Sequence, residues 1–167
     1  AVRYAAMENC VELLAYLRLS PAVGDQDFID GLSAAIQYGC ADSVQYILNL
    51  DIGPQHAELN VMLLHAIRCE PTDNKIIMLL VKYGADIHTD IDLPLVAASV
   101  NNNHELVHFI METGGYDQVV RNTAFIDACM RNNRHMIALL ADDSIGRGIV
   151  LEGLHKLVYN GALETIQ

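Results

Sequence analysis

One pattern of apolar residues recurs about every 30 residues along this 167-residue chain, and it limits the folds that the chain can adopt. The pattern is clearest between Val81 and Gly115, where two short apolar runs are separated by Asn101-Asn102-Asn103. Helices as short as these runs are marginal in water on their own. Such a unit must bury its apolar side against a neighbour of the same kind, so the sequence should contain further copies.

The copies can be aligned on one small residue, which we call the anchor, at steps of 30, 31, 32, 30 and 29 residues. The anchors are Ala5, Ala35, Ala66, Ala98, Ala128 and Leu157. Three positions before the anchors stand Val2, Leu32, Leu63, Leu95, Phe125 and Leu154. Four positions after them stand Asn9, Gly39, Asn102, Asn132 and Gly161, with a break in the third copy. Eight and nine positions after them stand Leu13-Leu14, Ser43-Val44, Leu106-Val107, Met136-Ile137 and Thr165-Ile166, and in the third copy Ile76-Ile77 come two places later.

These columns predict an all-α fold, a solenoid of stacked helix-turn-helix pairs with about six repeats, of which the first and last are incomplete. The expected repeats are approximately 1–24, 25–55, 56–87, 88–117, 118–146 and 147–167, all in a single domain 1–167. Asp30 and Thr123 are expected to cap the first helices of the second and fifth copies. Val2 already occupies the leucine column, and the sixth copy ends as its second helix begins, so we expect the chain to be a segment of a longer protein.

The repeat resembles the ankyrin repeat. Leu93-Pro94-Leu95-Val96-Ala97-Ala98 is similar to the family's helix opening, and Gly84-Ala85-Asp86 is its repeat ending. Leu154-His155 and Gly161-Ala162-Leu163-Glu164 match two further parts of the pattern, whereas the family's Thr-Pro pair is nowhere intact. The resemblance spans the whole chain. It implies inner helices that line a concave groove, links that project along one edge, and a non-catalytic role in binding other proteins.

The charge of the chain is strongly acidic, with 21 Asp and Glu against 10 Lys and Arg and a net charge of −11. The acidic residues concentrate between the expected helix pairs, at Asp25, Asp27, Asp30, Asp51, Glu58, Asp86, Asp90, Asp92, Asp117, Asp142 and Asp143. Only Arg121 and Arg147 are basic in these links. An acidic edge argues against nucleic acid and favours a partner with a basic surface, although the charges could equally serve solubility alone. The longest aliphatic run, from Ile76 to Val81, is too short for membrane insertion.

One short motif suggests a different chemistry. His104-Glu105-Leu106-Val107-His108 is a His-Glu-x-x-His sequence, which on a helix can bind zinc and provide a general base. In the repeat register, however, Glu105 and Leu106-Val107 fill ordinary columns, and no third ligand follows at the spacing that a zinc protease needs. A zinc hydrolase is therefore the remote alternative. We expect no enzyme activity, no metal and no cofactor.

The cysteines favour an intracellular protein. Cys10, Cys40, Cys69 and Cys129 form no Cys-x-x-Cys pair, which is typical of free thiols in a reducing compartment such as the cytoplasm. The asparagine-rich, divergent copies are similar to those of large DNA viruses and intracellular bacteria, for which the compartment would be the host cytoplasm.

Candidate partner-binding residues follow from the register, because positions one before and three after each anchor share one helical face. The residues chosen from this face are Tyr4, Glu8, Tyr38, His65, Asn101, Asp127 and Arg131, and Asp86, Asp90 and Asp92 are added from the acidic link. We expect a protein-protein interaction module that binds through the inner-helix groove and the acidic loops. The alternative is the recognition arm of a larger effector or ubiquitin-ligase adaptor. The sequence leaves the partner and the oligomeric state open.

Overall fold

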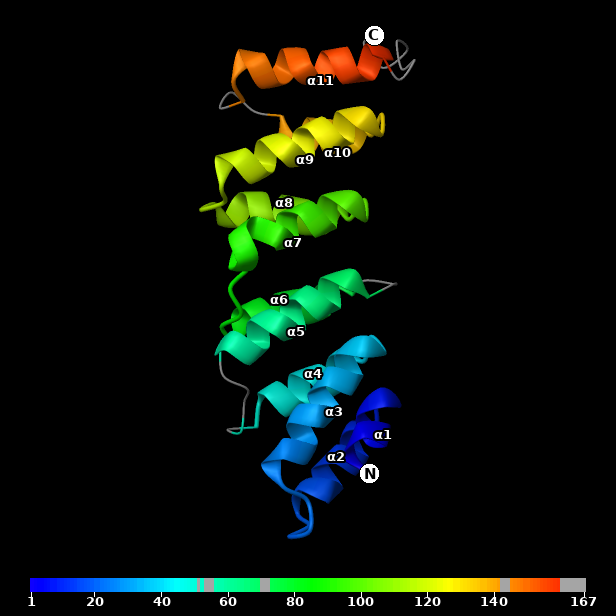
Figure 1. Cartoon of the computed structure of the whole chain (residues 1–167). Helices are drawn as coiled ribbons and strands as arrows, with labels where there is room; N and C mark the ends of the chain where they lie inside the picture. Colours follow the sequence, from blue (N-terminus) through cyan, green and yellow to red (C-terminus); the bar gives the residue numbers. More distant parts are fainter. Residues whose placement is uncertain (51, 53–55, 70–72, 142–144, 160–167) are drawn as a thin grey trace. The chain divides into compact units, whose positions relative to one another are not determined.

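Short helices make up the part of the chain that a computed structural model describes, which is residues 1–50, 52, 56–69, 73–141 and 145–159. These residues form eleven α-helices and no strand, so the expected all-α fold is confirmed (Figure 1). None of the described helices has both the length and the apolar character needed to cross a membrane. The chain divides into two compact units, 1–87 and 88–167.

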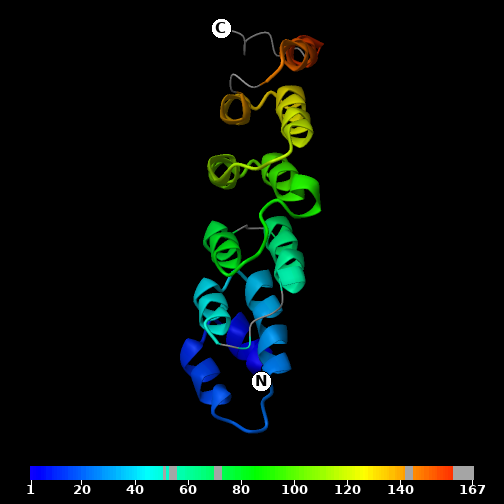
Figure 2. The ribbon, with the colours of Figure 1, turned by 90° about the vertical axis from the view of Figure 1, so that its left-hand side faces the viewer.

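The first unit contains three helix pairs. They are α1 (Val2–Met7) with α2 (Val11–Arg18), α3 (Asp25–Gln37) with α4 (Ala41–Leu48), and α5 (His56–Arg68) with α6 (Asn74–Lys82). The first helices of the pairs contact one another in the order α1, α3, α5, and the second helices contact one another in the order α2, α4, α6. We call these two layers the inner and outer helices, and they separate clearly in Figure 2.

The second unit continues the same alternation. It contains α7 (Thr89–Val100) with α8 (His104–Thr113), α9 (Gln118–Met130) with α10 (Arg134–Leu140), and α11 (Arg147–Tyr159). The inner helices α7, α9 and α11 contact one another in that order, and the outer helix α8 contacts α10.

The aligned columns form the core of both units. All six anchors are at most 5% exposed, and Leu95 and Leu106 are fully buried. The residue three before the anchor is buried in five copies, but Leu154 in α11 is 39% exposed. Burial of the columns confirms the periodicity on which the helix pairs were predicted.

The turn between the helices of a pair uses the left-handed backbone conformation. Asn9, Gly39, Asn102 and Asn132 have φ values of 52°, 70°, 56° and 54°. In each of these turns the anchor's carbonyl accepts a hydrogen bond of 2.8–3.0 Å from the backbone N–H five residues later. This is the Schellman ending of a helix, in which glycine or asparagine relieves the strain of positive φ. The Asn/Gly column is therefore a consequence of backbone geometry.

The expected caps at Asp30 and Thr123 were wrong, because the inner helices begin earlier than the apolar columns do. In α3, Asp27 accepts a hydrogen bond of 2.9 Å from the backbone N–H of Gly24, and Asp30 lies within the helix. In α9, Asp117 is the cap and accepts a 2.6 Å hydrogen bond from Val119. The Thr123 hydroxyl donates to the Val119 carbonyl one turn back, as hydroxyls do inside helices.

Arg121 does not belong to an exposed link. It is a fully buried residue of α9. Its Nε and Nη2 donate hydrogen bonds of 3.0 and 2.6 Å to the carbonyl of Leu140, the last residue of α10. Its guanidinium also lies 5.6 Å from the centre of the Tyr116 ring. A cation that binds a helix C-terminal carbonyl is favourable because that end of the helix carries partial negative charge.

Neighbouring inner helices approach closely at the position four before the anchor. A Cβ atom built on Gly31 of α3 would lie 2.9 Å from Val2 Cγ1, and one built on Gly153 of α11 would lie 2.9 Å from Phe125 and from Cys129 Sγ. At these two places only glycine leaves room for the preceding helix.

Candidate binding groove

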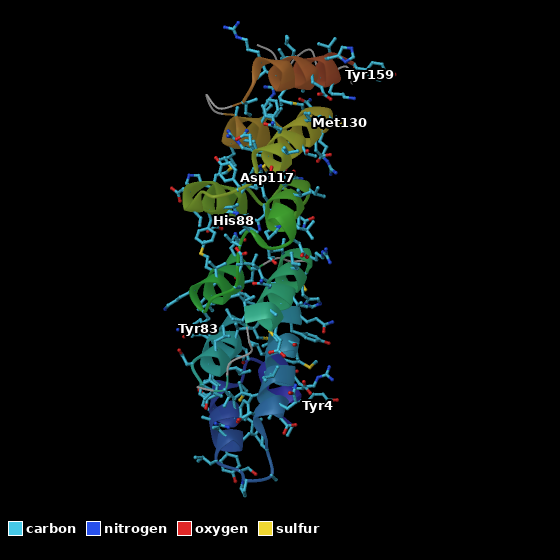
Figure 3. The ribbon with its side chains drawn as sticks, turned by 60° about the vertical axis from the view of Figure 1, so that its left-hand side comes forward. Tyr4, Tyr83, His88, Asp117, Met130 and Tyr159 are labelled. Carbon is cyan, nitrogen blue, oxygen red and sulfur yellow. The ribbon has the colours of Figure 1, made fainter. Side chains whose placement is uncertain are left out.

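The inner helices of the first unit form a groove of about 530 Å³. Its lining residues are Arg3 from α1, Asp30, Ser33, Ala34, Ile36 and Gln37 from α3, and Val61, Met62 and His65 from α5. Figure 3 shows Tyr4 of α1 projecting on the side of the inner helices that faces away from the outer layer. A concave site of this size is in the range of ligand and peptide pockets.

The width of the groove follows from the residue four before the anchor, the position at which neighbouring inner helices approach closely. In α3 this position is Gly31, which lets α3 lie against α1, whereas in α5 the equivalent residue is Met62. The Met62 side chain is buried and lines the groove, together with Ile36 from the facing side of α3. A long side chain holds two helices further apart than a glycine does, so we infer that Met62 opens the space between α3 and α5.

The groove combines an apolar floor with a polar rim. Ala34, Ile36 and Met62 are buried, whereas Arg3 and Gln37 are exposed. Val61 is 68% exposed at the edge of the groove. An apolar surface with a few charged groups around it suits a peptide segment better than an ion.

Only some of the residues that were predicted to bind a partner in the first unit line this groove. His65 lines it. Tyr4 of α1 is exposed, as are Glu8 and Tyr38, which follow the last residues of α1 and α3, but none of the three is among the lining residues. The prediction missed Arg3, Gln37, Val61 and Met62. Helical geometry could have indicated Val61, because it stands one turn before His65 on the same face.

The predicted residues of the second unit lie near a smaller notch of about 140 Å³. Val96, Ser99 and Val100 of α7 line it together with Thr123, Ala124 and Asp127 of α9. Asp127 is paired with Arg131, with 2.7 Å between Oδ2 and Nε, and only Asp127 lines the notch. Asn101 ends α7 and is exposed.

The acidic residues of the links have structural roles that the prediction did not include. Asp25, Asp27 and Glu58 lie in first turns of helices, and Asp117 caps α9. Negative charge is favourable there, because the N-terminus of a helix carries partial positive charge.

The candidate link residues occupy three different settings. Asp86 is exposed, and its backbone N–H donates a 2.7 Å hydrogen bond to Asn60 Oδ1. Asp90 is exposed at the start of α7 with a φ of 52°. The side chain of Asp92 lies outside the described part of the structure, as do Asp51, Asp142 and Asp143.

The two histidines of the His-Glu-x-x-His sequence point to different partners. His108 Nδ1 lies 3.3 Å from Glu112 Oε2. The ring of His104 meets that of His135 of α10 edge-to-face, with 5.5 Å between ring centres. Within the described residues, no three His, Cys, Asp or Glu side chains are grouped so that they could hold a metal ion. The contact between His104 and His135 joins two copies, which is why spacing within one helix did not reveal it.

All four cysteines are free thiols. Burial raises the pKa of Cys129 to about 11 and also raises the pKa values of Cys40 and Cys69. Thiols with raised pKa values are poor nucleophiles at neutral pH, so none of these three is activated for nucleophilic chemistry.

No family model, no curated protein and no solved structure matches this chain.

Proposed function

We propose that this chain is an ankyrin-type solenoid segment and a non-catalytic module that binds another protein. The groove of α1, α3 and α5 supports this proposal most directly, because it presents apolar surface with a polar rim on the inner helices. The repeated register and the left-handed Asn/Gly turns support the family assignment. Whether the segment acts alone or as the recognition arm of a larger effector or ubiquitin-ligase adaptor depends on the parent protein.

The partner that we propose is a peptide segment that combines an apolar residue with basic residues. The apolar residue would lie on Ala34, Ile36 and Met62. Basic residues would be attracted by Asp30 at the groove and by the net charge of −11. Long-range attraction of this kind raises association rates and weakens with salt.

A peptide-display selection against the purified chain tests the proposal, followed by affinity measurement in solution. Val61→Arg should weaken binding of the selected peptides at least tenfold, because it places a charged side chain at the edge of the groove. Val119→Arg is the matched control, since Val119 is 70% exposed and Val61 is 68% exposed, but Val119 lies in the second unit. Failure to select any peptide, or equal loss in both variants, would contradict binding in the groove.

The acidic-edge part of the proposal has its own test. Reversing Asp86, Asp90 and Asp92 to lysine should slow association with lysine- or arginine-rich peptides and reduce its salt dependence. If the association rate does not change, the acidic residues serve the helix ends and solubility only.

A further inference from the structure

The notch between α7 and α9 combines apolar side chains with side-chain oxygens. It measures about 140 Å³ and lies between two neighbouring inner helices of the second unit. Its lining residues divide into an apolar group and an oxygen-bearing group, namely Val96, Val100 and Ala124, and Ser99, Thr123 and Asp127.

The hydroxyl of Ser99 is buried without a partner. Ser99 is 3% exposed, and its Oγ forms no hydrogen bond with the described residues. A hydroxyl inside a helix can donate to the carbonyl four residues back, as Thr113 and Thr123 do at 2.8 and 2.9 Å. Ser99 forms no such bond, although it lies within α7. A buried polar atom without a partner costs free energy, so it indicates that a further group belongs at this site.

Asp127 places a negative charge in the same notch. Its Oδ2 is also buried, and it lies 2.7 Å from Arg131 Nε in an ion pair that lacks the geometry of a hydrogen bond. Arg131 is exposed and follows the last residue of α9. Two buried oxygens of one small site, one neutral and one charged, are therefore without a hydrogen-bond donor among the described residues.

The group that would complete the notch is a donor with positive charge. A carboxylate only accepts hydrogen bonds, and the Thr123 hydroxyl already donates its proton to the Val119 carbonyl. The ammonium group of lysine carries three N–H donors at the end of an alkyl chain, which the apolar side of the notch would contact. The planar fork of an arginine fits less well, because Arg131 already faces the Asp127 carboxylate.

We propose that the notch of α7 and α9 receives the side chain of a lysine from a protein partner. The net charge of −11 attracts such a cation, and a volume of about 140 Å³ suits one side chain. The inference rests on the proposed function, because the lysine belongs to a protein that binds this chain. It does not rest on the groove of the first unit, since no residue lines both sites.

An NMR titration with a single blocked lysine tests the notch directly. The probe is N-acetyl-lysine methylamide, added up to ~20 mM so that a Kd in the millimolar range is detected. The backbone amide signals of Ser99, Val100 and Asp127 should shift and reach saturation. N-acetyl-norleucine methylamide keeps an alkyl chain but lacks the ammonium group, and it should cause no saturable shift.

Three substitutions should change lysine binding in different directions. Asp127→Asn should weaken it about tenfold and Ser99→Ala about threefold, because a charged and a neutral acceptor are removed. Arg131→Gln should strengthen it about threefold, because a competing cation is removed. Glu152→Gln is the matched control, at an exposed carboxylate of α11 in the same unit, and should leave binding unchanged. Far-UV circular dichroism checks that each variant is folded.

The outcomes separate lysine binding from simpler explanations. No saturable shift with the lysine probe would overturn the proposal, because the notch would then hold water only. Equal shifts from the lysine and norleucine probes would overturn it as well, since the site would be a merely apolar pocket. Equal weakening in Asp127→Asn and Glu152→Gln would show non-specific attraction by the net charge and would also overturn it.

The notch and the groove can fail separately. If the lysine probe binds the notch but no peptide is selected by the groove, only binding in the groove is contradicted. If groove-binding peptides are selected but the lysine probe does not bind, only the lysine site is contradicted.

Discussion

Arg121 shows how one residue can have a role opposite to that expected from its neighbours in the sequence. It stands four residues after Asp117, in a stretch that was expected to be a link, so an exposed position was the natural expectation. In the structure it is buried and binds the carbonyl that ends α10. The long side chain of arginine reaches a helix end in the same copy and supplies donors to an acceptor that the helix leaves unsatisfied.

Arg121→Met should destabilise the chain by about 2 kcal/mol or more, because methionine fills similar space but leaves the buried Leu140 carbonyl without these donors. Urea unfolding followed by circular dichroism measures the change. Arg147→Met, at an exposed position of α11, is the control and should change stability by less than about 0.5 kcal/mol. Equal effects of the two substitutions would contradict a structural role for Arg121.

The thiols should differ in reactivity because of burial. With a pKa of about 11, only about one Cys129 in a thousand is a thiolate at pH 8, and the side chain is also buried. Iodoacetamide at pH 8 should therefore modify the half-buried Cys10 first and Cys129 last. Peptide mapping by mass spectrometry over time gives the order, and in urea the difference should disappear. Early modification of Cys129 in the native chain would contradict its burial.

At the scale of elements, the turn after each inner helix is set by the backbone. Asn9, Gly39, Asn102 and Asn132 share positive φ and the same hydrogen-bond pattern, although their side chains differ. The two residue types recur because they tolerate the left-handed conformation best. Glycine is therefore needed where φ is positive, as at Gly39, and can be replaced where the backbone is helical.

Substituting two glycines by alanine should have opposite effects. Gly39→Ala should destabilise by about 1 kcal/mol, because φ is 70° and the added Cβ meets no other atom, so only backbone strain changes. Gly148→Ala, in the first turn of α11 and also in open space, should stabilise by about 0.5 kcal/mol, because alanine restricts the unfolded chain. The urea midpoints of the two variants, compared with that of the unmodified chain, test this prediction. A shift of both midpoints in the same direction would refute the opposite effects expected for the two glycines.

Polar side chains connect successive turns of the first unit. Asp42 accepts hydrogen bonds of 3.2 Å from Asn9 Nδ2 in the preceding pair and 3.0 Å from Lys75 Nζ in the following pair. In the second unit, Asn133 Nδ2 donates a 2.6 Å hydrogen bond to Asn102 Oδ1. These bonds lie about one repeat apart in sequence and hold the ends of neighbouring helix pairs in register.

The Asp42 contacts should make stability depend on pH. The side-chain hydrogen bond from Lys75 and then that from Asn9 lower the pKa of the Asp42 carboxyl below 3.8. A lowered folded-state pKa contributes stability that is present above the unfolded value and is lost as pH falls through the folded value. Asp42→Asn should therefore lower the thermal midpoint at pH 7, and the difference from the unmodified chain should shrink below pH 3.8. Glu12→Gln, at an exposed carboxylate of α2, is the control. A difference that is the same at pH 7 and pH 3 would be inconsistent with this contact.

For the whole molecule, the excess of negative charge is the dominant electrostatic feature. Several acidic residues are placed favourably at helix N-termini, yet a net charge of −11 still repels itself in the compact state. The balance between these two effects is open to measurement.

Raising NaCl from ~10 to ~150 mM should raise the thermal midpoint, because the Debye length falls to about 8 Å and like charges across the molecule are screened. Differential scanning fluorimetry at low protein concentration measures the midpoint without self-association. Choline chloride at equal ionic strength should give the same shift if screening is the cause. A midpoint that falls with salt would mean that favourable charge pairs outweigh the repulsion.

The repeat register was sufficient to predict most of the helix pairs. The spacing of Ala35, Ala66 and the other anchors indicated buried columns, and the Asn/Gly column indicated the turns, because both depend on local helical geometry. Helix starts were predicted less well. Asp30 and Thr123 resemble N-caps in sequence. Which residue caps a helix depends, however, on where the backbone enters the helix, and α3 and α9 begin earlier.

The amino-acid sequence by itself determined that this chain forms paired helices with a buried apolar column, because hydrophobic period and left-handed turns are properties of neighbouring residues. Tertiary structure decided that Arg121 is buried, that Met62 lies where the groove opens, and that His104 meets His135. The Met62 and His104 outcomes depend on contacts between different helix pairs, whose distance and angle no single repeat specifies. The Arg121 outcome depends on how closely α10 approaches α9, which the local pattern does not specify either.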